Sequence, residues 1–272
     1  MKNRSPCSAR RAKILERALL VCLLLAGTCL NAAQSQETRV TQVVNDVNLA
    51  SAAVPRRVAV GERLRDGDAI NTGITGRSEL TFANQTIARL GAKTNISVSD
   101  ETRTIDLAEG AVLFQIPEGA GRLKLKTAAI ALVSTGATAI IERHGEFYVK
   151  VLVLEGTVRC YLTHRLGESL LLQPGQILIT KSDVTALPEP ADFDIAREMN
   201  TCLLVRDFQP LASQRRIETE EQKQLKLIAK GTYIPSNLVI LGRGTQVTLV
   251  NAPSTTPPPK ALTNTSQESH TP

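Results

Sequence analysis

Glycine-punctuated short apolar runs fill residues 58–135 and constrain the fold more than any other feature of this chain. They read VAVGERLRDGDAINTGITGRSELTFANQTIARLGAKTNISV, then TIDLAEGAVLFQI and LKLKTAAIALVSTG. Each apolar run is four to seven residues long and ends at Gly, Asn or Asp, residue types that favour turns. The pattern therefore predicts strand after strand, and it excludes a long helix in this region.

The pattern of short strands continues to Lys181, with a new strand expected every 8 to 14 residues. The β-branched content of residues 37–48 favours an additional first strand. The later strands are expected at residues 79–82, 87–90, 95–98, 104–107, 112–116, 123–127, 130–134, 137–142, 147–154, 156–162, 169–172 and 176–180. Regular short strands between glycine turns predict a mainly β sandwich, barrel or solenoid, and the spacing alone leaves all three open.

Six motifs follow one another in a specific order along these strands. They are Gly-x-x-Leu-x-x-Gly-Asp-x-Ile-x-Thr-Gly at 61–73, Arg-Ser-Glu-Leu-Thr-Phe at 77–82, Ala-Arg-Leu-Gly at 88–91, Leu-x-x-Gly-x-Val-x-Phe at 107–114, Val-x-Thr-Gly at 133–136 and Val-x-Glu-Gly-x-Val at 153–158. In this order they resemble the FecR domain, the periplasmic module of bacterial iron-transport regulators, over roughly residues 44–180. The resemblance implies a β-solenoid or compressed β-helix. The glycines expected at its turns are Gly61, Gly67, Gly73, Gly91, Gly110, Gly136 and Gly156.

The first 35 residues are predicted to be a signal peptide. They hold six basic residues and one acidic residue, an apolar stretch at residues 18–30, and the small residues Ala32, Ala33 and Ser35. A helix needs about 20 apolar residues to span a bilayer, so this shorter stretch is typical of a cleaved export signal. The mature protein is expected to be periplasmic or secreted. The alternatives are an inner-membrane anchor formed by residues 18–33 and lipidation at Cys29.

Cleavage of that signal removes three of the five cysteines and leaves Cys160 and Cys202. An even pair in an oxidising compartment favours a disulfide, and the other interpretation is two buried free thiols. Cleavage also removes most of the net charge of +6, because residues 36–272 carry a net charge of only +1. With no Trp, three Tyr and five Phe, the chain lacks the charge and stacking groups of a nucleic-acid-binding protein.

The residues after the strands divide into shorter segments. An apolar run at residues 199–205 is expected to dock on the β-domain, and the charged, glycine-free segment that follows favours a surface helix with a thin apolar stripe. The predicted division is a signal peptide at 1–35, a FecR-like β-domain at 36–185, a connector at 186–211, a surface helix at 212–230, a β-hairpin at 231–251 and a disordered tail at 252–272.

Catalytic and metal-binding patterns are missing from the sequence. His144 and His164 fall in expected turns, and no His-x-His, Cys-x-x-Cys or Gly-x-Ser-x-Gly spacing occurs. Asp66-Gly67-Asp68 is interpreted as a turn rather than a calcium site, because Asp accepts hydrogen bonds from its own turn and Gly supplies a positive φ. We therefore predict no catalytic residues, no metal, no cofactor and no small-molecule substrate.

The function expected from these observations is that of a stand-alone exported FecR-domain protein, a non-enzymatic module that binds another protein of the cell envelope. In the FecR family the periplasmic domain contacts an outer-membrane receptor, and a cytoplasmic domain controls a sigma factor. About 17 residues precede the apolar stretch here, too few for such a cytoplasmic domain. The alternatives are a transmembrane signalling regulator related to iron-transport systems and a structural envelope or glycan-binding protein.

Overall fold

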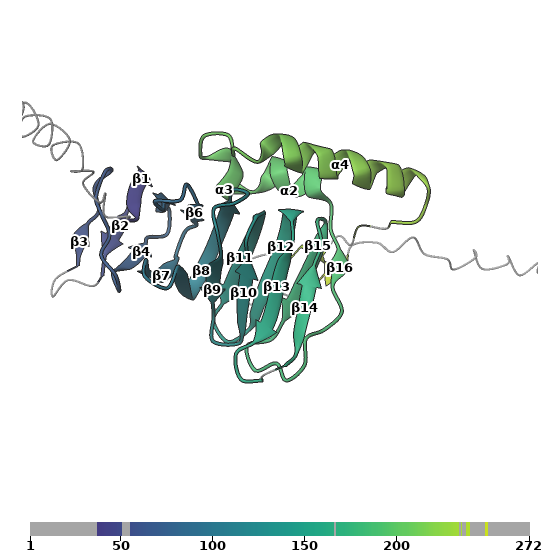
Figure 1. The fold of residues 1–272 in the computed structure, drawn as a ribbon, viewed down its shortest axis with the longest axis horizontal. Helices are drawn as coiled ribbons and strands as arrows, with labels where there is room; N and C mark the ends of the chain where they lie inside the picture. Colours follow the sequence, from purple (N-terminus) through teal and green to yellow (C-terminus); the bar gives the residue numbers. More distant parts are fainter. Residues whose placement is uncertain are drawn as a thin grey trace, which may run out of the picture. The chain divides into compact units, whose positions relative to one another are not determined.

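The computed structural model describes residues 37–50, 55–165, 167–233 and 235, and two further strands at 238–239 and 248–249. From Thr38 onward the chain forms one compact unit, which is mainly β with a C-terminal helix, as the sequence predicted (Figure 1). The predicted signal peptide, the predicted tail and most of the predicted hairpin lie outside the described residues. No helix of the described residues is long and apolar enough to cross a membrane.

Two sheets form the body of this unit. The first, which we call the covered sheet, has the spatial order β1 (Arg39–Val44), β5 (Arg77–Thr81), β6 (Ile87–Leu90), the second half of β8 (Thr104–Ile116), β11 (Ala137–His144), β12 (Tyr148–Gly156), β15 (Gln176–Thr180) and β16 (Ala191–Asp192). All of its neighbouring strands are antiparallel.

The second sheet, the open sheet, has the order β3 (Arg56–Arg57), β2 (Val47–Leu49), β4 (Ala69–Thr72), β7 (Asn95–Ser99), the first half of β8, β9 (Leu123–Lys126), β10 (Ile130–Ser134), β13 (Val158–Leu162) and β14 (Ser169–Leu172). Its neighbours are antiparallel except β8 and β9, which are parallel. Along the chain, groups of consecutive strands belong alternately to one sheet and to the other. The sheets do not close into a barrel.

Strand β8 links the two sheets by bending at Gly110. Two strands were predicted here, at 104–107 and 112–116, but a single strand of 13 residues spans both. Its first half pairs with β7 in the open sheet, and its second half pairs with β11 in the covered sheet. Gly110 has φ +96°, and a Cβ there would lie 2.3 Å from Thr94 Oγ1. Only glycine fits this bend, because both the backbone angle and the close approach exclude a side chain.

The central strands of the covered sheet are apolar on both faces, and successive side chains of each strand point to opposite faces. On β8 and β12, Phe114 and Val153 point into the core between the two sheets. Their neighbours Leu113 and Leu152 point outward into a second hydrophobic cluster. Three helices supply the other side of that cluster, at α2 (Ile195–Thr201), α3 (Leu203–Arg206) and α4 (Gln214–Ala229). Figure 1 shows these helices gathered on one side of the sheets.

The C-terminal part differs in detail from the sequence prediction. The region expected to be a connector contains α2 and α3, and Leu204 of α3 is buried, as expected of a run that docks on the β-domain. The expected surface helix is α4, which buries Ile217 and Gln224 while Leu225 is 47% exposed. Beyond it, the strands β17 (Leu238–Val239) and β18 (Thr248–Leu249) form an antiparallel pair.

Candidate functional site

The predicted turn glycines are distributed along the β-domain and do not form a common site. Gly61, Gly67, Gly110 and Gly156 have positive φ, and of these Gly110 lies within β8 and Gly156 at the end of β12. Gly73, Gly91 and Gly136 do not have positive φ. At Gly156 a Cβ would lie 2.3 Å from the carbonyl oxygen of Gly136, so the absent side chain lets β11 and β12 approach closely.

The structure does not bring the two predicted disulfide partners together. Cys160 is a free, fully buried cysteine of β13 in the core between the sheets. Cys202 is also free, and it packs against the separate cluster beneath the helices. Burial raises the pKa of each thiol to about 12, so both remain protonated at neutral pH. The disulfide prediction is therefore wrong for this structure, because the sequence did not show that the two residues lie on opposite sides of the covered sheet.

The predicted acidic turn forms as a turn. Gly67 has φ +81°, and Asp68 accepts a hydrogen bond from the backbone amide of Arg65 at 2.8 Å. His144 stacks on Tyr148, with 5.5 Å between ring centroids. Within the described ranges no group of three or more His, Cys, Asp or Glu side chains is placed to hold a metal ion.

The basic residues near that turn are spread over a loop and a short strand. Arg56 forms an ion pair with Glu62, and the strand that contains Arg56 and Arg57 lies at the edge of the open sheet. The backbone of Arg63 forms an isolated antiparallel β-bridge with the backbone of Arg39 in β1. The side chain of Arg56 is therefore held by Glu62 next to the first turns of the domain.

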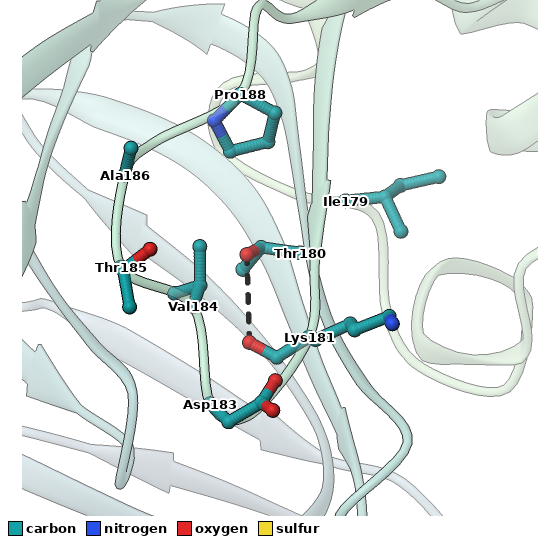
Figure 2. A pocket seen from close by; sticks show the side chains of 8 residues that line it. All are labelled: Ile179, Thr180, Lys181, Asp183, Val184, Thr185, Ala186 and Pro188. Carbon is teal, nitrogen blue, oxygen red and sulfur yellow. Dashed lines mark hydrogen bonds between the residues drawn. The ribbon is translucent and has the colours of Figure 1, made fainter.

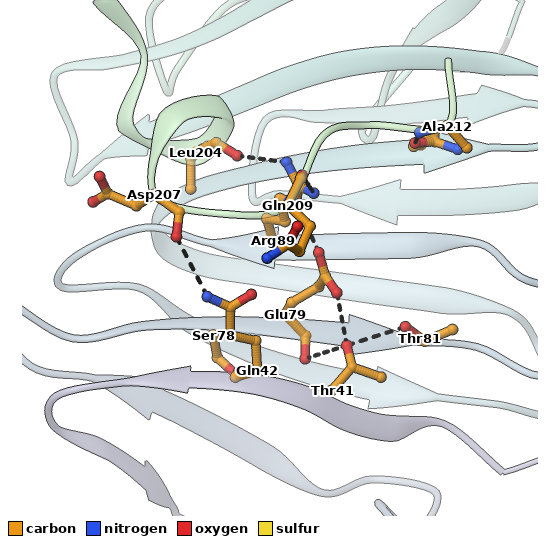
Figure 3. A network of polar contacts seen from close by, with 11 residues as sticks. Thr41, Gln42, Ser78, Glu79, Thr81, Arg89, Leu204, Asp207, Gln209 and Ala212 are labelled. Atoms are coloured by element: carbon orange, nitrogen blue, oxygen red, sulfur yellow. Dashed lines mark hydrogen bonds and ion pairs between the residues drawn. The ribbon is translucent and has the colours of Figure 1, made fainter. Parts of the chain in front are cut away.

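A buried arginine fastens the helical segment to the covered sheet (Figure 3). The side chain of Arg89 on β6 is 1% exposed and pairs with Glu79 of β5 at 2.9 Å. Its two terminal nitrogens donate hydrogen bonds to the carbonyl oxygens of Leu204 and Gln209, at 3.1 and 2.6 Å. The guanidinium also lies 4.9 Å from the ring centroid of Phe208. Burial lowers the pKa of Arg89, and the contact with Glu79 opposes that shift.

A second buried polar group fastens the start of α4. Thr138 Oγ1 lies 2.7 Å from both Glu155 Oε1 and Ser213 Oγ, and all three residues are buried. Arg216 of α4 completes the group with two contacts of 3.2 Å to the Glu155 carboxylate. These charges and hydroxyls satisfy one another, which is the arrangement required of buried polar groups in a structural contact.

A third cluster lies beneath α2. Lys150 of β12 pairs with Glu142 of β11 at 2.6 Å. Burial raises the pKa of Glu198 on α2, and the nearby Lys150 opposes that shift. The Lys150–Glu142 ion pair is half-buried and joins two strands of the covered sheet, close enough to α2 to act electrostatically on Glu198.

A shallow hollow of about 410 Å³ lies beside the C-terminal end of β15 (Figure 2). It is lined by Ile179, Thr180, Lys181, Asp183, Val184, Thr185, Ala186 and Pro188. Its two charged residues, Lys181 and Asp183, are both exposed, and the only hydrogen bond drawn within it joins Thr180 to the Lys181 carbonyl oxygen. Such a hollow has no converging polar groups to fix a ligand.

The outer face of the open sheet presents a different kind of surface. The strand register places its residues in two rows across β8, β9, β10, β13 and β14. The first row is Thr104, Lys124, Val133, Arg159 and Leu171. The second row is Asp106, Lys126, Ala131, Tyr161 and Ser169. We call these ten residues the open face, and the contact of α4 with the strands is made on the other sheet, at β12.

The open face could not be recognised from the sequence alone. Its basic residues alternate with core residues in LKLK on β9 and VRCYL on β13, a pattern that does signal strands with one solvated side. The missing information was the pairing of strands, because Lys124 and Arg159 come together only through β10.

Comparisons with known proteins agree with the resemblance seen in the motifs. Residues 68–159 match the sequence model of the family described as FecR protein, which confirms the FecR resemblance for this part of the chain. No curated protein matches the chain.

Two solved structures, both described as a proposed anti-sigma factor from Parabacteroides distasonis ATCC 8503, are similar to part of the fold. One is 17% identical with a TM-score of 0.43, over 50% of this chain and 63% of that chain. The other is 14% identical with a TM-score of 0.40, over 52% of this chain and 76% of that chain. This chain therefore spans less than two thirds of the first structure's length.

Proposed function

We propose that this chain, which carries a FecR domain at residues 68–159, is a non-enzymatic protein-binding module of the cell envelope with a role in signalling. The FecR match carries this proposal, because the family's periplasmic domains act by contacting other envelope proteins. The matched residues include β8, the strand that joins the two sheets, so the match covers the centre of the domain.

The distribution of polar groups supports a binding module. The buried charged residues Arg89 and Glu155 are each paired and link the helical segment to the covered sheet, and the half-buried Lys150 pairs with Glu142 within that sheet. Groups used in catalysis more often converge on a cleft with a perturbed pKa and an open path to a substrate. The open face instead offers a broad, solvated surface of the kind that proteins use to bind each other.

The proposal includes export through residues 1–35 to the periplasm or the cell surface, with anchoring by residues 18–33 as the alternative. We also propose that the β-domain is a flattened solenoid. The alternating addition of strand groups to two sheets supports that description.

The test combines fractionation and crosslinking of the full-length chain at its natural level in its own cells. An amine-reactive crosslinker that does not cross membranes should join the chain to one or a few envelope proteins, identified by mass spectrometry. Deleting the gene should change the transcription of a defined set of genes. Absence of any protein adduct, together with retention of the chain on purified peptidoglycan or polysaccharide, would replace this function with that of a structural glycan-binding protein.

A further inference from the structure

The two outer faces of the β-domain differ in what covers them. The outer face of the covered sheet packs Leu113, Ile140 and Leu152 against helices α2 to α4. The open face contains no comparable set of large buried apolar residues; Thr104 and Ala131 are buried, and the other eight side chains are partly or fully exposed. Leu171 is 39% exposed, and Arg159 and Ser169 are also exposed.

The open face carries more positive than negative charge. Lys124 and Lys126 of β9 and Arg159 of β13 face one carboxylate, that of Asp106 on β8. Asp106 lies beside Lys126 in the parallel register, so Lys124 and Arg159 have no acidic neighbour in their row. Arg159 donates a hydrogen bond to the Ser169 hydroxyl at 3.3 Å, which orients the guanidinium without neutralising it.

The positions of these cations follow from sheet geometry. Residues two apart on a strand are about 7 Å apart, and residues on strands two places apart in a sheet are about 10 Å apart. Lys124 and Lys126 are related in the first way, and Lys124 and Arg159 in the second. A short protein segment with two or three nearby carboxylates presents negative charges at similar separations.

Apolar and aromatic groups lie between the cations. Val133 stands between Lys124 and Arg159, and Tyr161 and Leu171 are the next residues on β13 and β14. Tyr and Arg are enriched in protein interfaces, where an apolar body is combined with a polar tip. A polyanion such as an acidic glycan needs only the charges, and the near-neutral net charge of +1 for residues 36–272 provides no wider field to hold one.

We infer that the open face is the docking surface for an acidic segment of a protein partner. This inference rests on the proposed function and adds the surface and the chemistry of the partner to it. Lys124, Lys126 and Arg159 pair with the partner's carboxylates, and Val133, Tyr161 and Leu171 contact its apolar side chains. With strands about 4.8 Å apart, the five strands of this face extend for about 20 Å, a size suited to a short segment and a transient complex.

The test is site-specific photocrosslinking of the full-length chain in its own cells. The photoreactive residue p-benzoylphenylalanine replaces Tyr161 or Leu171 on the open face, or Gln222 on the solvent side of α4. A discrete protein adduct is expected from the two positions on the open face, at least 10-fold stronger than from position 222. The adducted peptide of the partner, identified by mass spectrometry, should contain two or more Asp or Glu residues. Raising the salt concentration of isolated envelopes to 1 M should weaken the adduct, because exposed charges are then screened.

A charge-reversal variant with a matched control supplies the second arm. Lys124→Glu combined with Lys126→Glu should reduce the adduct from position 161 at least 10-fold. Arg215→Glu combined with Lys226→Glu makes the same change in net charge on the exposed side of α4, and it should leave the adduct unchanged. Because Glu at position 126 would face Asp106, the milder pair Lys124→Gln and Lys126→Gln is measured as well, and thermal melting of every variant verifies folding.

The outcomes separate this inference from the function on which it rests. Protein adducts from position 222 but not from 161 or 171 would refute the open face as the docking surface and retain the protein-binding function. Adducts to glycan, to a second copy of this chain, or to a segment without acidic residues would refute the chemistry of the partner. If no position forms a protein adduct and amine crosslinking of the wild-type chain is also negative, the proposed protein-binding function itself is refuted.

Discussion

Replacing Arg89 by Met should destabilise the protein more than any other single polar-to-apolar change on the covered sheet. Met retains much of the length of the aliphatic chain and its packing but removes the guanidinium. The change leaves the Glu79 carboxylate, 13% exposed, without its cation. It also leaves the carbonyl oxygens of Leu204 and Gln209 without a side-chain donor.

The size of the effect follows from these three losses. Removing one partner of a buried ion pair costs about 3–5 kcal/mol, because the other charge remains buried without compensation. Each buried carbonyl oxygen left without a donor adds up to about 1–3 kcal/mol, less wherever water enters. Because the residues act as one network, the contributions are not additive, and we expect the free energy of unfolding to fall by about 3–5 kcal/mol in total.

A double-mutant cycle gives the sharper measurement. Glu79→Gln removes the charge that Arg89→Met leaves unpaired, so the double variant should be more stable than Arg89→Met alone. Replacing a whole buried pair is often nearly neutral, whereas breaking it is not. Urea denaturation followed by circular dichroism gives the free energies of unfolding for all four proteins. Hydrogen exchange should show the largest loss of protection around α3, where two of the hydrogen bonds end.

Two results would show that this reasoning is wrong. A loss of less than about 1 kcal/mol for Arg89→Met would mean that the ion pair and its hydrogen bonds contribute no more than an exposed pair. A double variant no more stable than Arg89→Met would mean that the unpaired charge of Glu79 is not the source of the loss. Unchanged exchange near α3 would likewise separate Arg89 from the attachment of the helices.

Three further predictions concern single residues. Gly110→Ala should lower the free energy of unfolding by about 3 kcal/mol or more, because steric overlap with Thr94 is added to a backbone strain of about 1–3 kcal/mol. Gly61→Ala should lower it by the backbone strain alone, because no atom lies near the added Cβ. Equal melting temperatures for the two variants would contradict the bend in β8. Burial raises the pKa of Glu198, so the native state binds the Glu198 proton more tightly than the unfolded chain does. The contribution of Glu198 to the stability of the folded state therefore falls as the pH rises through this raised pKa. Glu198→Gln should therefore flatten the decline in stability that begins as the pH rises above 4.5, the ordinary pKa of glutamate, and an unchanged slope would refute this account. Cys160 and Cys202 should react slowly with iodoacetamide in the native protein at pH 8, and peptide mapping after non-reducing denaturation should find both alkylated; finding them joined would restore the disulfide.

The strands could be predicted from sequence wherever two local signals agree. The residues of β6, β10, β14 and β15 were predicted with their observed bounds, because short apolar runs and flanking turn residues mark the same limits. The split predicted at Gly110 was wrong for an instructive reason. Glycine with a positive φ can end a strand or bend one, and only the pairing on both sides of the residue decides between the two.

The attachment of the helices could not be predicted in the same way. Arg89 was visible only as part of a motif on a strand, and its three partners lie at Glu79, Leu204 and Gln209. Two of these contacts span more than 100 residues and end on backbone carbonyl groups, which leave no signature in side-chain sequence. The burial of Gln224 on α4 could not be predicted for the same reason. Its side chain forms hydrogen bonds with the distant backbone groups of Phe193 and Ile195.

If the open face is the docking surface that we propose, the two sheets divide structural and binding roles, and their sequences differ accordingly. A covered-sheet strand that lies beneath the helices is apolar on both faces, and β12 has Val151, Leu152 and Val153 in succession, all buried. A strand of the open sheet needs only one apolar face, so β9 alternates leucine with lysine. Because folding constrains only the inward positions of β9, β13 and β14, their outward residues are free to be selected for a partner. An excess of cations at those positions, around Tyr161 and Leu171, is what selection for an acidic protein segment would produce.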